Sequence, residues 1–366
     1  MITIVGLGPA GIDQMTIEAW NAVEGAARVI VRTLAHPAAS ELAARRPVES
    51  CDDLYEQAED FAGVYEQIAA RVLEAAGSGP VVYAVPGHPS IAERAVSLIR
   101  EKAAAGGTEV AILDAPSFLD VLFSRLGVDP LDGGIQVLDA RQLARPMLLG
   151  LPTVFAQVDT PLVAGELKGR LLEVLEPGHP VSVATDVGLA SELLSRVGVE
   201  ELDRIPVGPR TSVFVDPGQV GWPGLMAVSM RLRQECPWDA RQTHHSLARH
   251  LIEEAYELME AIAQLPAESP AGEPDLPAYL EVEEELGDVL LQVVFHSMLA
   301  GEAGVFDIES VAEHHRRKLV ARHPHVFGVA GGPPIAVDGA PAVTHTWAKI
   351  TPTEKQRDSL MDDVPV

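Results

Sequence analysis

The sequence predicts two domains of different fold class, an α/β domain at residues 1–215 and an all-α domain at residues 225–350. Short β-like runs alternate with Ala/Leu/Glu-rich helical segments in the first part, which is typical of an α/β domain. In the second part long helical stretches follow one another without a convincing strand. Because turn-forming Gly and Pro gather before Leu225, we expect a linker at residues 216–224.

The first domain contains seven runs with the composition of strands, separated by helical segments such as 56–76 and 90–105. These runs are residues 1–6, 27–31, 80–85, 108–113, 134–138, 147–151 and 180–185. Strands that alternate with helices indicate crossover connections, so we expect a largely parallel sheet.

The second domain is expected to consist of four helices, and the Pro-rich segment 265–277 separates the second from the third. The helical stretches are residues 225–234, 243–264, 278–300 and 309–322. Residues 351–366 form a tail with little sign of regular structure.

Charge and composition exclude several classes of function. The formal charge is −26, and acidic residues outnumber basic ones in both parts of the chain, so a broad nucleic-acid interface is not expected. No apolar run approaches the roughly 18 residues of a membrane span, so we expect no membrane partner. The N-terminus lacks the pattern of a signal peptide, and the two cysteines form no CxxC motif. We therefore expect a cytoplasmic protein.

Two acidic pairs lie beside the apolar stripes of the second and third helices. At 100° per residue, Glu254 and Glu257 border one stripe, whereas Glu285 and Asp288 share a line on the next helix. The loop between the helices is long enough for an antiparallel hairpin that brings the pairs together. Four clustered carboxylates repel one another unless protons or cations intervene, and all-oxygen ligation favours Mg²⁺ or Mn²⁺. The sequence therefore predicts a Mg²⁺ site, with Mn²⁺ as the alternative.

Other interpretations of these carboxylates receive less support. An acidic, solvated hairpin would explain one pair, but two pairs that flank apolar stripes favour a metal. A di-iron site would need Glu-x-x-His on two helices, and a zinc protease would need HExxH; neither motif is present. Gln292 and His296 continue the line of Glu285, and we expect them either to support the ligands or to lie at an interface.

A source of positive charge follows on the fourth helix. Lys318 and Arg322 are spaced i,i+4 and share a face suited to gripping a polyphosphate. Ser310 and Glu313 predict a capping box at the start of this helix, and Pro324 is expected to end it.

Four segments of this half resemble the MazG family of nucleoside triphosphate pyrophosphohydrolases. They are CPWDARQTHHSL (236–247), LIEEAYEL (251–258), EEELGDVLLQVVFH (283–296) and KLVARHPHVFG (318–328). The resemblance implies an all-α fold that forms a homodimer through the helical domain. It also implies that Glu254, Glu257, Glu285 and Asp288 bind Mg²⁺, and that Lys318 and Arg322 contact the phosphates of a nucleoside triphosphate.

The reaction implied by this resemblance is attack of water between the α and β phosphates, which yields nucleoside monophosphate and pyrophosphate. Glu253 and Glu254 are the candidates for the group that takes the proton of water, although the helical angles point Glu253 outward. Trp238 packs either near the base or in the core. Trp347 matches a substrate position of the family, but Thr351 stands where the family often has Lys.

The N-terminal glycine loop contains a literal G-x-G-x-x-G at Gly6, Gly8 and Gly11, which suggests a dinucleotide fold. Two features count against this interpretation. Thr16 is a better helix N-cap than the third glycine, and the second strand is followed by Arg32 and Thr33 rather than by an acidic residue for the ribose.

The same stretch, GLGPAGIDQMTIEAWNAVEGAARVIV, resembles the opening of the tetrapyrrole (corrin/porphyrin) methylase family, as do YAVPGHPSIAE (83–93) and LDAPSFLD (113–120). The resemblance implies S-adenosylmethionine binding by two loops, through Gly6, Gly8, Pro9, Gly87, His88 and Pro89. Ala10 replaces a usual Gly, and His88 replaces a usual acidic residue. A domain retained as a scaffold is therefore the alternative.

Three functions remain for the whole chain. The first is a Mg²⁺-dependent nucleotide pyrophosphohydrolase fused to a methylase-like domain. The second is an S-adenosylmethionine-dependent methyltransferase whose helical domain serves mainly for dimerisation. The third is a non-catalytic nucleotide sensor. The intact set of four carboxylates favours the first.

Overall fold

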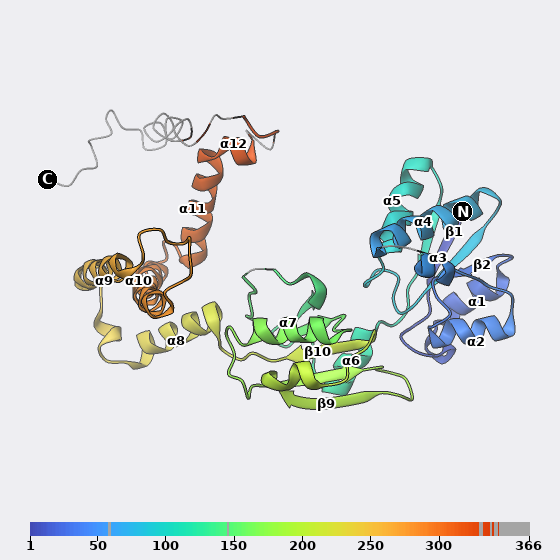
Figure 1. Ribbon diagram of the computed structural model, residues 1–366, viewed down its shortest axis with the longest axis horizontal. Coiled ribbons are helices and arrows are strands. Elements are labelled where there is room, and N and C mark those ends of the chain that lie inside the picture. The colour runs from blue at the N-terminus through green and yellow to red at the C-terminus, as the bar shows by residue number, and fades with distance from the viewer. Residues whose placement is uncertain (58–59, 145, 329–331, 337–338, 340–342, 344–366) are drawn as a thin grey trace. The chain divides into compact units, whose positions relative to one another are not determined.

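The computed structural model describes the chain except for residues 58–59, 145, 329–331, 337–338, 340–342 and 344–366 (Figure 1). The chain divides into two compact units, Met1–Gly224 and Leu225–Val366. Within the described residues, no helix is both long and apolar enough to cross a membrane.

The first unit begins with a five-stranded sheet in which every pairing is parallel. Its strand order is β3-β2-β4-β1-β5. The strands are β1 (Ile2–Gly6), β2 (Val29–Val31), β3 (Glu49–Ser50), β4 (Val81–Val85) and β5 (Val110–Leu113). The helices among them are α1 (Ile17–Gly25), α2 (Pro37–Arg45), α3 (Asp52–Gln57), α4 (Phe61–Gly77) and α5 (Arg94–Gly106). This sheet confirms the predicted α/β class.

Helices cover both faces of this sheet. Alternate side chains of each strand point to opposite faces, so one strand contributes to a core on either side. Ile2 and Ile4 of β1 enter a core that includes Ile68 of α4 and residues of α5. Val5 enters a second core, with Val23 of α1 and residues of α2. The strands therefore consist of nearly continuous apolar runs, as expected for a sheet buried on both faces.

A second sheet in the first unit is mostly antiparallel, which corrects the expectation of one largely parallel sheet. Its strands in spatial order are β6 (Gln136–Asp139), β7 (Thr153–Ala156), β10 (Thr211–Val215), β8 (Pro180–Thr185) and β9 (Leu193–Gly198). Only β6 and β7 pair in parallel. The helices of this part of the chain are α6 (Phe118–Leu126), before β6, and α7 (Pro161–Leu171), between β7 and β8.

The sequence prediction failed at particular strands of the first unit. Residues 147–151 are not a strand, because this apolar run is a connection that leads into β7. Four strands were not predicted: the two-residue β3, and β7, β9 and β10. The last of these lies just before the Gly/Pro-rich linker, where turn residues concealed its alternation.

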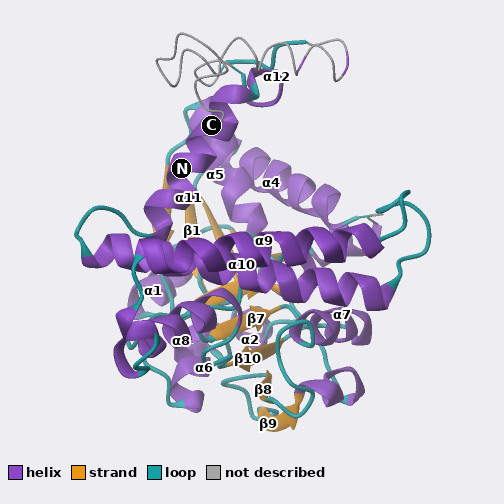
Figure 2. Ribbon diagram, turned by 90° about the vertical axis from the view of Figure 1, so that its left-hand side faces the viewer, coloured by secondary structure: helices purple, strands orange, loops and turns teal. Residues whose placement is uncertain are grey.

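The second unit is helical, in agreement with the prediction. Helix α8 (Gly221–Glu235) begins in the first unit and continues into the second, which then contains α9 (His244–Gln264), α10 (Leu276–Glu302), α11 (Ile308–Arg322) and α12 (Pro324–Phe327). Helices α9 and α10 lie side by side as the predicted hairpin (Figure 2). Thr243 and Asp275 cap their N-termini through side-chain oxygens.

The core of the hairpin is smaller than the apolar stripes suggest. Its buried cluster consists of Leu247, Phe295 and Leu299, packed against the half-buried Leu291 and Met298. Other stripe positions, expected to face a core, are substantially exposed; they include Leu251, Ile262, Leu286, Leu290 and Val293. No described element of this unit covers these positions, so the hairpin presents apolar surface to its surroundings.

Helix α11 starts differently from the prediction. Asp307 is the N-cap, and its carboxylate accepts a hydrogen bond from the backbone N–H of Ser310 at 2.8 Å. The predicted capping box of Ser310 with Glu313 is wrong, because Glu313 instead forms ion pairs with Arg316 and Arg317, at 2.6 Å each. These pairs hold the pKa of Glu313 down to about 2.

Candidate metal centre and glycine loops

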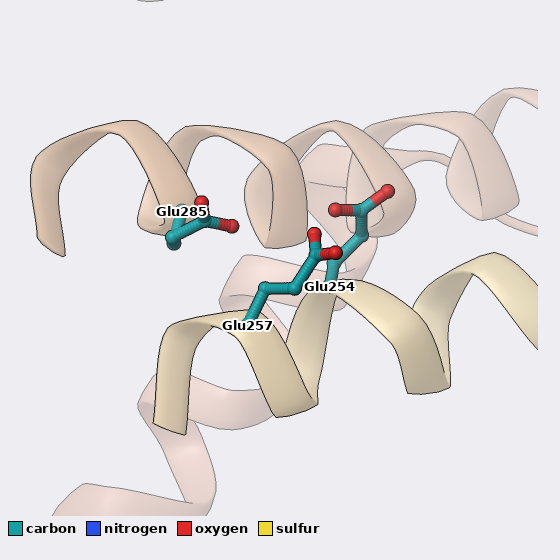
Figure 3. Close-up of side chains that lie close together, drawn as sticks. All are labelled: Glu254, Glu257 and Glu285. Carbon is teal, nitrogen blue, oxygen red and sulfur yellow. The ribbon is translucent and has the colours of Figure 1, made fainter. Parts of the chain in front are cut away.

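Three of the four predicted carboxylates come together between α9 and α10. Oxygens of Glu254, Glu257 and Glu285 all lie within 4.8 Å of one another, and within the described residues they form a group that could hold a metal ion. Figure 3 shows two of them rising from α9 toward the third on α10. The antiparallel hairpin creates this meeting, because residues one turn apart on each helix face the same gap.

Asp288 stands beside this cluster rather than within it. Its charge raises the pKa of both Glu254 and Glu285, which places its carboxylate near theirs. Partial burial is the largest cause of both raised pKa values. Glu257 also adds to the repulsion on both groups. The four carboxylates therefore repel one another, and binding of a metal ion by all four stays a prediction.

The properties of this group fit a divalent cation. One oxygen of Glu285, Oε2, is buried without a hydrogen-bond partner among the described residues. A buried acceptor without a donor is costly, and crowded carboxylates raise one another's pKa. A cation bound by these oxygens would remove both penalties. The donors are all carboxylate oxygens, which are suited to Mg²⁺ or Mn²⁺.

Glu253 lies outside the cluster and is exposed. Its Oε2 lies 3.3 Å from Nδ1 of His250, and Nε of Arg249 lies 3.3 Å from the other ring nitrogen of His250. Because Arg249 can only donate, His250 must donate its Nδ1–H to Glu253. The ring centroid of His250 lies 5.9 Å from that of Trp238, edge to face. The sequence did not single out His250, although its place one turn before Glu254 is a signal that could have found it.

The polar line of α10 continues beyond Asp288. Gln292 is buried, and His296 is half-buried and stacks on His244, with the two Nδ1 atoms 2.8 Å apart. Burial, followed by His244, lowers the pKa of His296. Gln292 Oε1 and His296 Nε2 are buried and have no hydrogen-bond partner among the described residues.

The predicted phosphate-binding cations lie on another helix. Lys318 and Arg322 are half-buried, one turn apart, on α11, which packs against α10. The carboxylate cluster itself involves only α9 and α10. Trp347, Lys349 and Thr351 lie outside the described residues.

In the first unit, the two glycine loops meet where adjacent strands β1 and β4 end. Gly8 and Gly87 form an isolated antiparallel bridge, and both have positive φ, 74° and 62°. A Cβ on Gly6 would lie 2.6 Å from the carbonyl oxygen of Gly87 and 2.6 Å from Cβ of Ala115. Helix α1 begins after Thr16, whose side chain caps it, so the argument against a dinucleotide loop is confirmed.

The strand order marks this meeting point as a candidate site for a ligand. From β1 the chain passes into α1, which packs on one face of the sheet, and from the neighbouring strand β4 it passes into α5, which packs on the other. In open parallel sheets, ligands bind at the carboxyl ends of neighbouring strands whose connections lie on opposite faces. Pro9 and Pro89 lie in the two loops, so all six residues of the predicted cofactor site are in this region.

His88 occupies the second loop in a fixed orientation. Its Nδ1 accepts the backbone N–H of Ser90 at 3.0 Å, and its Nε2 lies 3.5 Å from a carboxylate oxygen of Asp114. Asp114 follows β5 directly. The sequence reasoning missed Asp114, although the end of a parallel strand is where functional side chains gather.

Two other titratable groups of the first unit were not predicted. Burial lowers the pKa of His36 to about 4, with Arg210 as the next cause. Burial raises the pKa of Glu93 to about 7, against the opposing effect of its ion pair with Arg32. Tyr55 accepts a hydrogen bond from Arg32 at 2.9 Å, so this pair belongs to a buried network.

Family comparisons assign both parts of the chain. The family model of tetrapyrrole (corrin/porphyrin) methylases matches residues 1–203, and that of the MazG nucleotide pyrophosphohydrolase domain matches residues 242–327. The chain belongs to the tetrapyrrole (corrin/porphyrin) methylase family and carries a MazG nucleotide pyrophosphohydrolase domain in its C-terminal part. The match to the MazG domain includes all four carboxylates, and the match to the methylase domain includes both glycine loops.

One relative aligns with the whole chain, and two others align with part of it. The protein YabN of Bacillus subtilis is 36% identical over 377 residues, which cover 100% of this chain and 73% of YabN. The nucleoside triphosphate pyrophosphohydrolase/pyrophosphatase MazG of Thermotoga maritima is 46% identical over 110 residues, or 30% of this chain and 38% of that protein. The nucleoside triphosphate pyrophosphohydrolase of Escherichia coli is 34% identical over 147 residues, which cover 38% of this chain and 49% of that protein. The match therefore spans less than half the length of the latter two proteins.

Proposed function

We propose that the MazG domain hydrolyses nucleoside triphosphates to nucleoside monophosphates and pyrophosphate in a Mg²⁺-dependent reaction. The observation that carries this proposal is the meeting of Glu254, Glu257 and Glu285 between two helices. The names of the Thermotoga maritima and Escherichia coli relatives support it.

The residues of this site have distinct roles in the proposal. Glu254, Glu257, Glu285 and Asp288 hold the cation. Bound there, Mg²⁺ would neutralise phosphate charge and lower the pKa of a water molecule. Lys318 and Arg322 on α11 bind the phosphates through charge-assisted hydrogen bonds.

Glu253 is the candidate acceptor of the proton from water. Its Oε2 accepts a hydrogen bond from the Nδ1–H of His250, which fixes the orientation of the carboxylate. The other oxygen of Glu253 is then oriented to accept a proton.

The products of the reaction test this proposal. Offered a nucleoside triphosphate with Mg²⁺, the protein should release pyrophosphate and nucleoside monophosphate in equal amounts, resolved by ³¹P NMR. Release of orthophosphate with nucleoside diphosphate would place the cleavage at the other anhydride bond and contradict the proposal, as would the absence of turnover.

We also propose that the helical unit forms a homodimer through a second exposed apolar stripe of α9, on a different face from Leu251 and Ile262. The stripe consists of three residues that are 59%, 64% and 63% exposed, namely Ile252, Tyr256 and Met259. At about 100° per residue this stripe points away from the carboxylates. Dimerisation through it therefore leaves the carboxylate cluster accessible. An apolar face of this kind on a helix is typical of an interface.

Met259→Asp is expected to convert the dimer to a monomer, because a charge in an apolar interface loses its hydration without gaining a partner. Sedimentation equilibrium measures the mass directly. Leu131→Asp is the matched control, because Leu131 is 90% exposed in the other unit. A monomeric wild type, or a Met259→Asp variant of unchanged dimeric mass, would rule out this interface.

For the methylase domain we propose binding of S-adenosylmethionine by Gly6, Gly8, Pro9, Gly87, His88 and Pro89. The bridge between Gly8 and Gly87, at the carboxyl ends of the neighbouring strands β1 and β4, supports this site. A domain that serves only as a scaffold is the alternative.

A further inference from the structure

A third loop meets the two glycine loops of the methylase domain. It begins at Asp114, directly after β5, and β5 is the neighbour of β1 on the side away from β4. A Cβ on Gly6 would lie 2.6 Å from Cβ of Ala115, and the hydroxyl of Thr16 donates to the backbone carbonyl of Asp114 at 3.4 Å. The carboxyl ends of β4, β1 and β5 therefore come together, where side chains from all three can reach a ligand.

Asp114 brings an exposed carboxylate to this place. Its side chain is 75% exposed, and within the part of the chain that the structure describes it forms no ion pair with a lysine or an arginine. The contact that it does make is with His88, whose Nε2 lies 3.5 Å from Oδ1. This distance is longer than that of a close hydrogen bond, so both carboxylate oxygens keep capacity to accept from a ligand.

The ring of His88 is held so that it presents a hydrogen to this carboxylate. Its Nδ1 accepts the backbone N–H of Ser90 at 3.0 Å. A neutral imidazole that accepts at one nitrogen carries its hydrogen on the other, so Nε2 is the donor. Such a neutral donor orients the carboxylate of Asp114 without cancelling its negative charge.

The arginine at the neighbouring end of β2 is engaged elsewhere. Arg32 forms an ion pair with the buried carboxylate of Glu93, and its Nε donates to the hydroxyl of Tyr55 at 2.9 Å. The positive charge of Arg32 is therefore balanced within its own network. Asp114 keeps a negative charge at the meeting point of the loops, and a charge of this kind favours a cationic group of a ligand.

We propose that Asp114 recognises a cationic group of the ligand bound at the glycine loops, and that the ring of His88 contributes to the site by orienting this carboxylate. The inference rests on the proposed binding of S-adenosylmethionine, and it adds a residue from a third strand to that site. S-adenosylmethionine carries two cationic groups, an ammonium and a sulfonium, and a carboxylate attracts either. His88 stands where an acidic residue is usual, and in this chain β5 supplies the carboxylate instead.

Asp114→Asn removes the charge and keeps the shape of the side chain. The dissociation constant for S-adenosylmethionine, measured by titration calorimetry, should rise about 10-fold, near the lower end for a contact with a charged group because the carboxylate is exposed. Added salt should weaken binding to the wild type more than to Asp114→Asn, because salt screens a charge pair. 5′-Methylthioadenosine has neither cationic group, so both proteins should bind it equally.

S-adenosylhomocysteine distinguishes the two cationic groups, because it has the ammonium but not the sulfonium. If Asp114 pairs with the ammonium, Asp114→Asn should weaken both amino-acid-bearing compounds to the same extent. If Asp114 pairs with the sulfonium, only S-adenosylmethionine should bind more weakly. Either result supports the inference. Equal weakening of all three compounds would show that Asp114 acts on the shape of the site, and unchanged affinity for S-adenosylmethionine would show that the carboxylate contacts no cationic group; each overturns it.

A double-mutant cycle tests the role of His88. His88→Ala should weaken binding of S-adenosylmethionine in the wild type, but should cost nothing more when Asp114 is already Asn, because the ring acts through the carboxylate. Binding of 5′-methylthioadenosine should stay unchanged in all four proteins. If the two losses added in full, the ring of His88 would act independently of Asp114, and its orienting role would be wrong.

Glu109→Gln is the matched control. Glu109 is exposed and precedes β5, so this change removes one negative charge at the opposite end of the same strand. Its affinities should equal those of the wild type, and weakening equal to that of Asp114→Asn would reduce the effect to net charge and overturn the inference. A wild type that binds none of the three compounds would refute cofactor binding itself. A wild type and an Asp114→Asn variant that bind S-adenosylmethionine equally would refute only the role of Asp114.

Discussion

Replacing Glu285 with Gln is expected to reduce nucleoside triphosphate hydrolysis by more than about 100-fold, because loss of groups that merely support metal ligands already costs 10- to 100-fold. In the proposed site Glu285 contributes a charge and two oxygens, of which Oε2 has no other partner among the described residues. The amide keeps the shape of the side chain but supplies one weaker acceptor. The initial rate of pyrophosphate release measures the loss.

The same substitution should raise the thermal stability of the metal-free protein. The pKa of Glu285 is raised above 4.5 by partial burial, and then by Glu257 and Asp288. A carboxyl with a raised pKa in the folded state destabilises the fold above that pKa, and this penalty disappears as the pH falls through it. Gln removes the penalty at every pH. The gain in Tm should therefore be largest near about pH 8 and should shrink on acidification toward 4.5.

Glu283→Gln is the matched control. Glu283 lies on the same helix, two residues earlier, is exposed, and at about 100° per residue points away from Glu285. Its substitution should leave both the rate and the Tm close to wild type. If Glu285→Gln retained wild-type turnover, the assignment of its carboxylate to the metal would be wrong.

Gly6→Ala is expected to destabilise the methylase domain by about 1–3 kcal/mol, the usual cost of overpacking. The new Cβ would lie 2.6 Å from the carbonyl oxygen of Gly87 and 2.9 Å from Cδ of Pro89. Because backbone and a proline ring cannot turn aside, the two glycine loops must separate. Differential scanning calorimetry should show a lower transition temperature for this domain.

Separation of the loops should also abolish the binding of S-adenosylmethionine, measured by titration calorimetry. Gly169→Ala is the control, because Gly169 is exposed within α7 and no atom lies within 4 Å of its would-be Cβ. That change should stabilise the domain by about 0.5–1 kcal/mol and leave the heat of binding unchanged. Absence of heat in the wild type would refute cofactor binding and favour the scaffold. Wild-type stability of Gly6→Ala would refute the close approach of the loops.

The carboxylate site could be predicted from sequence because it depends on local geometry. The spacing of Glu254 with Glu257, and of Glu285 with Asp288, fixes a face on each helix. A hairpin is the simplest way to join two successive helices. No local sequence pattern indicates which other side chains lie next to these carboxylates. The contact of His250 with Trp238 depends on how the chain turns before α9, which the sequence does not specify.

The second sheet of the first unit could not be predicted from local sequence patterns. Its strands β9 and β10 pair with β8 from either side, and neither has the long apolar run of a buried parallel strand. A strand of this kind is stabilised by its neighbours rather than by its own pattern. The apolar stripe of α9 also depends on what packs against it. Its spacing predicts that Leu251 and Ile262 lie in a core, but in the structure both are exposed.

The central claim is that the carboxylates between α9 and α10 hold a divalent cation, and binding of Mn²⁺ tests it most directly. Free Mn²⁺ gives an electron paramagnetic resonance signal that disappears on binding, so the titration needs no substrate and no turnover. The wild type should bind Mn²⁺ saturably, Mg²⁺ should compete for the site, and Glu285→Gln should bind much more weakly while Glu283→Gln matches the wild type. Identical isotherms for the wild type and Glu285→Gln would contradict the account.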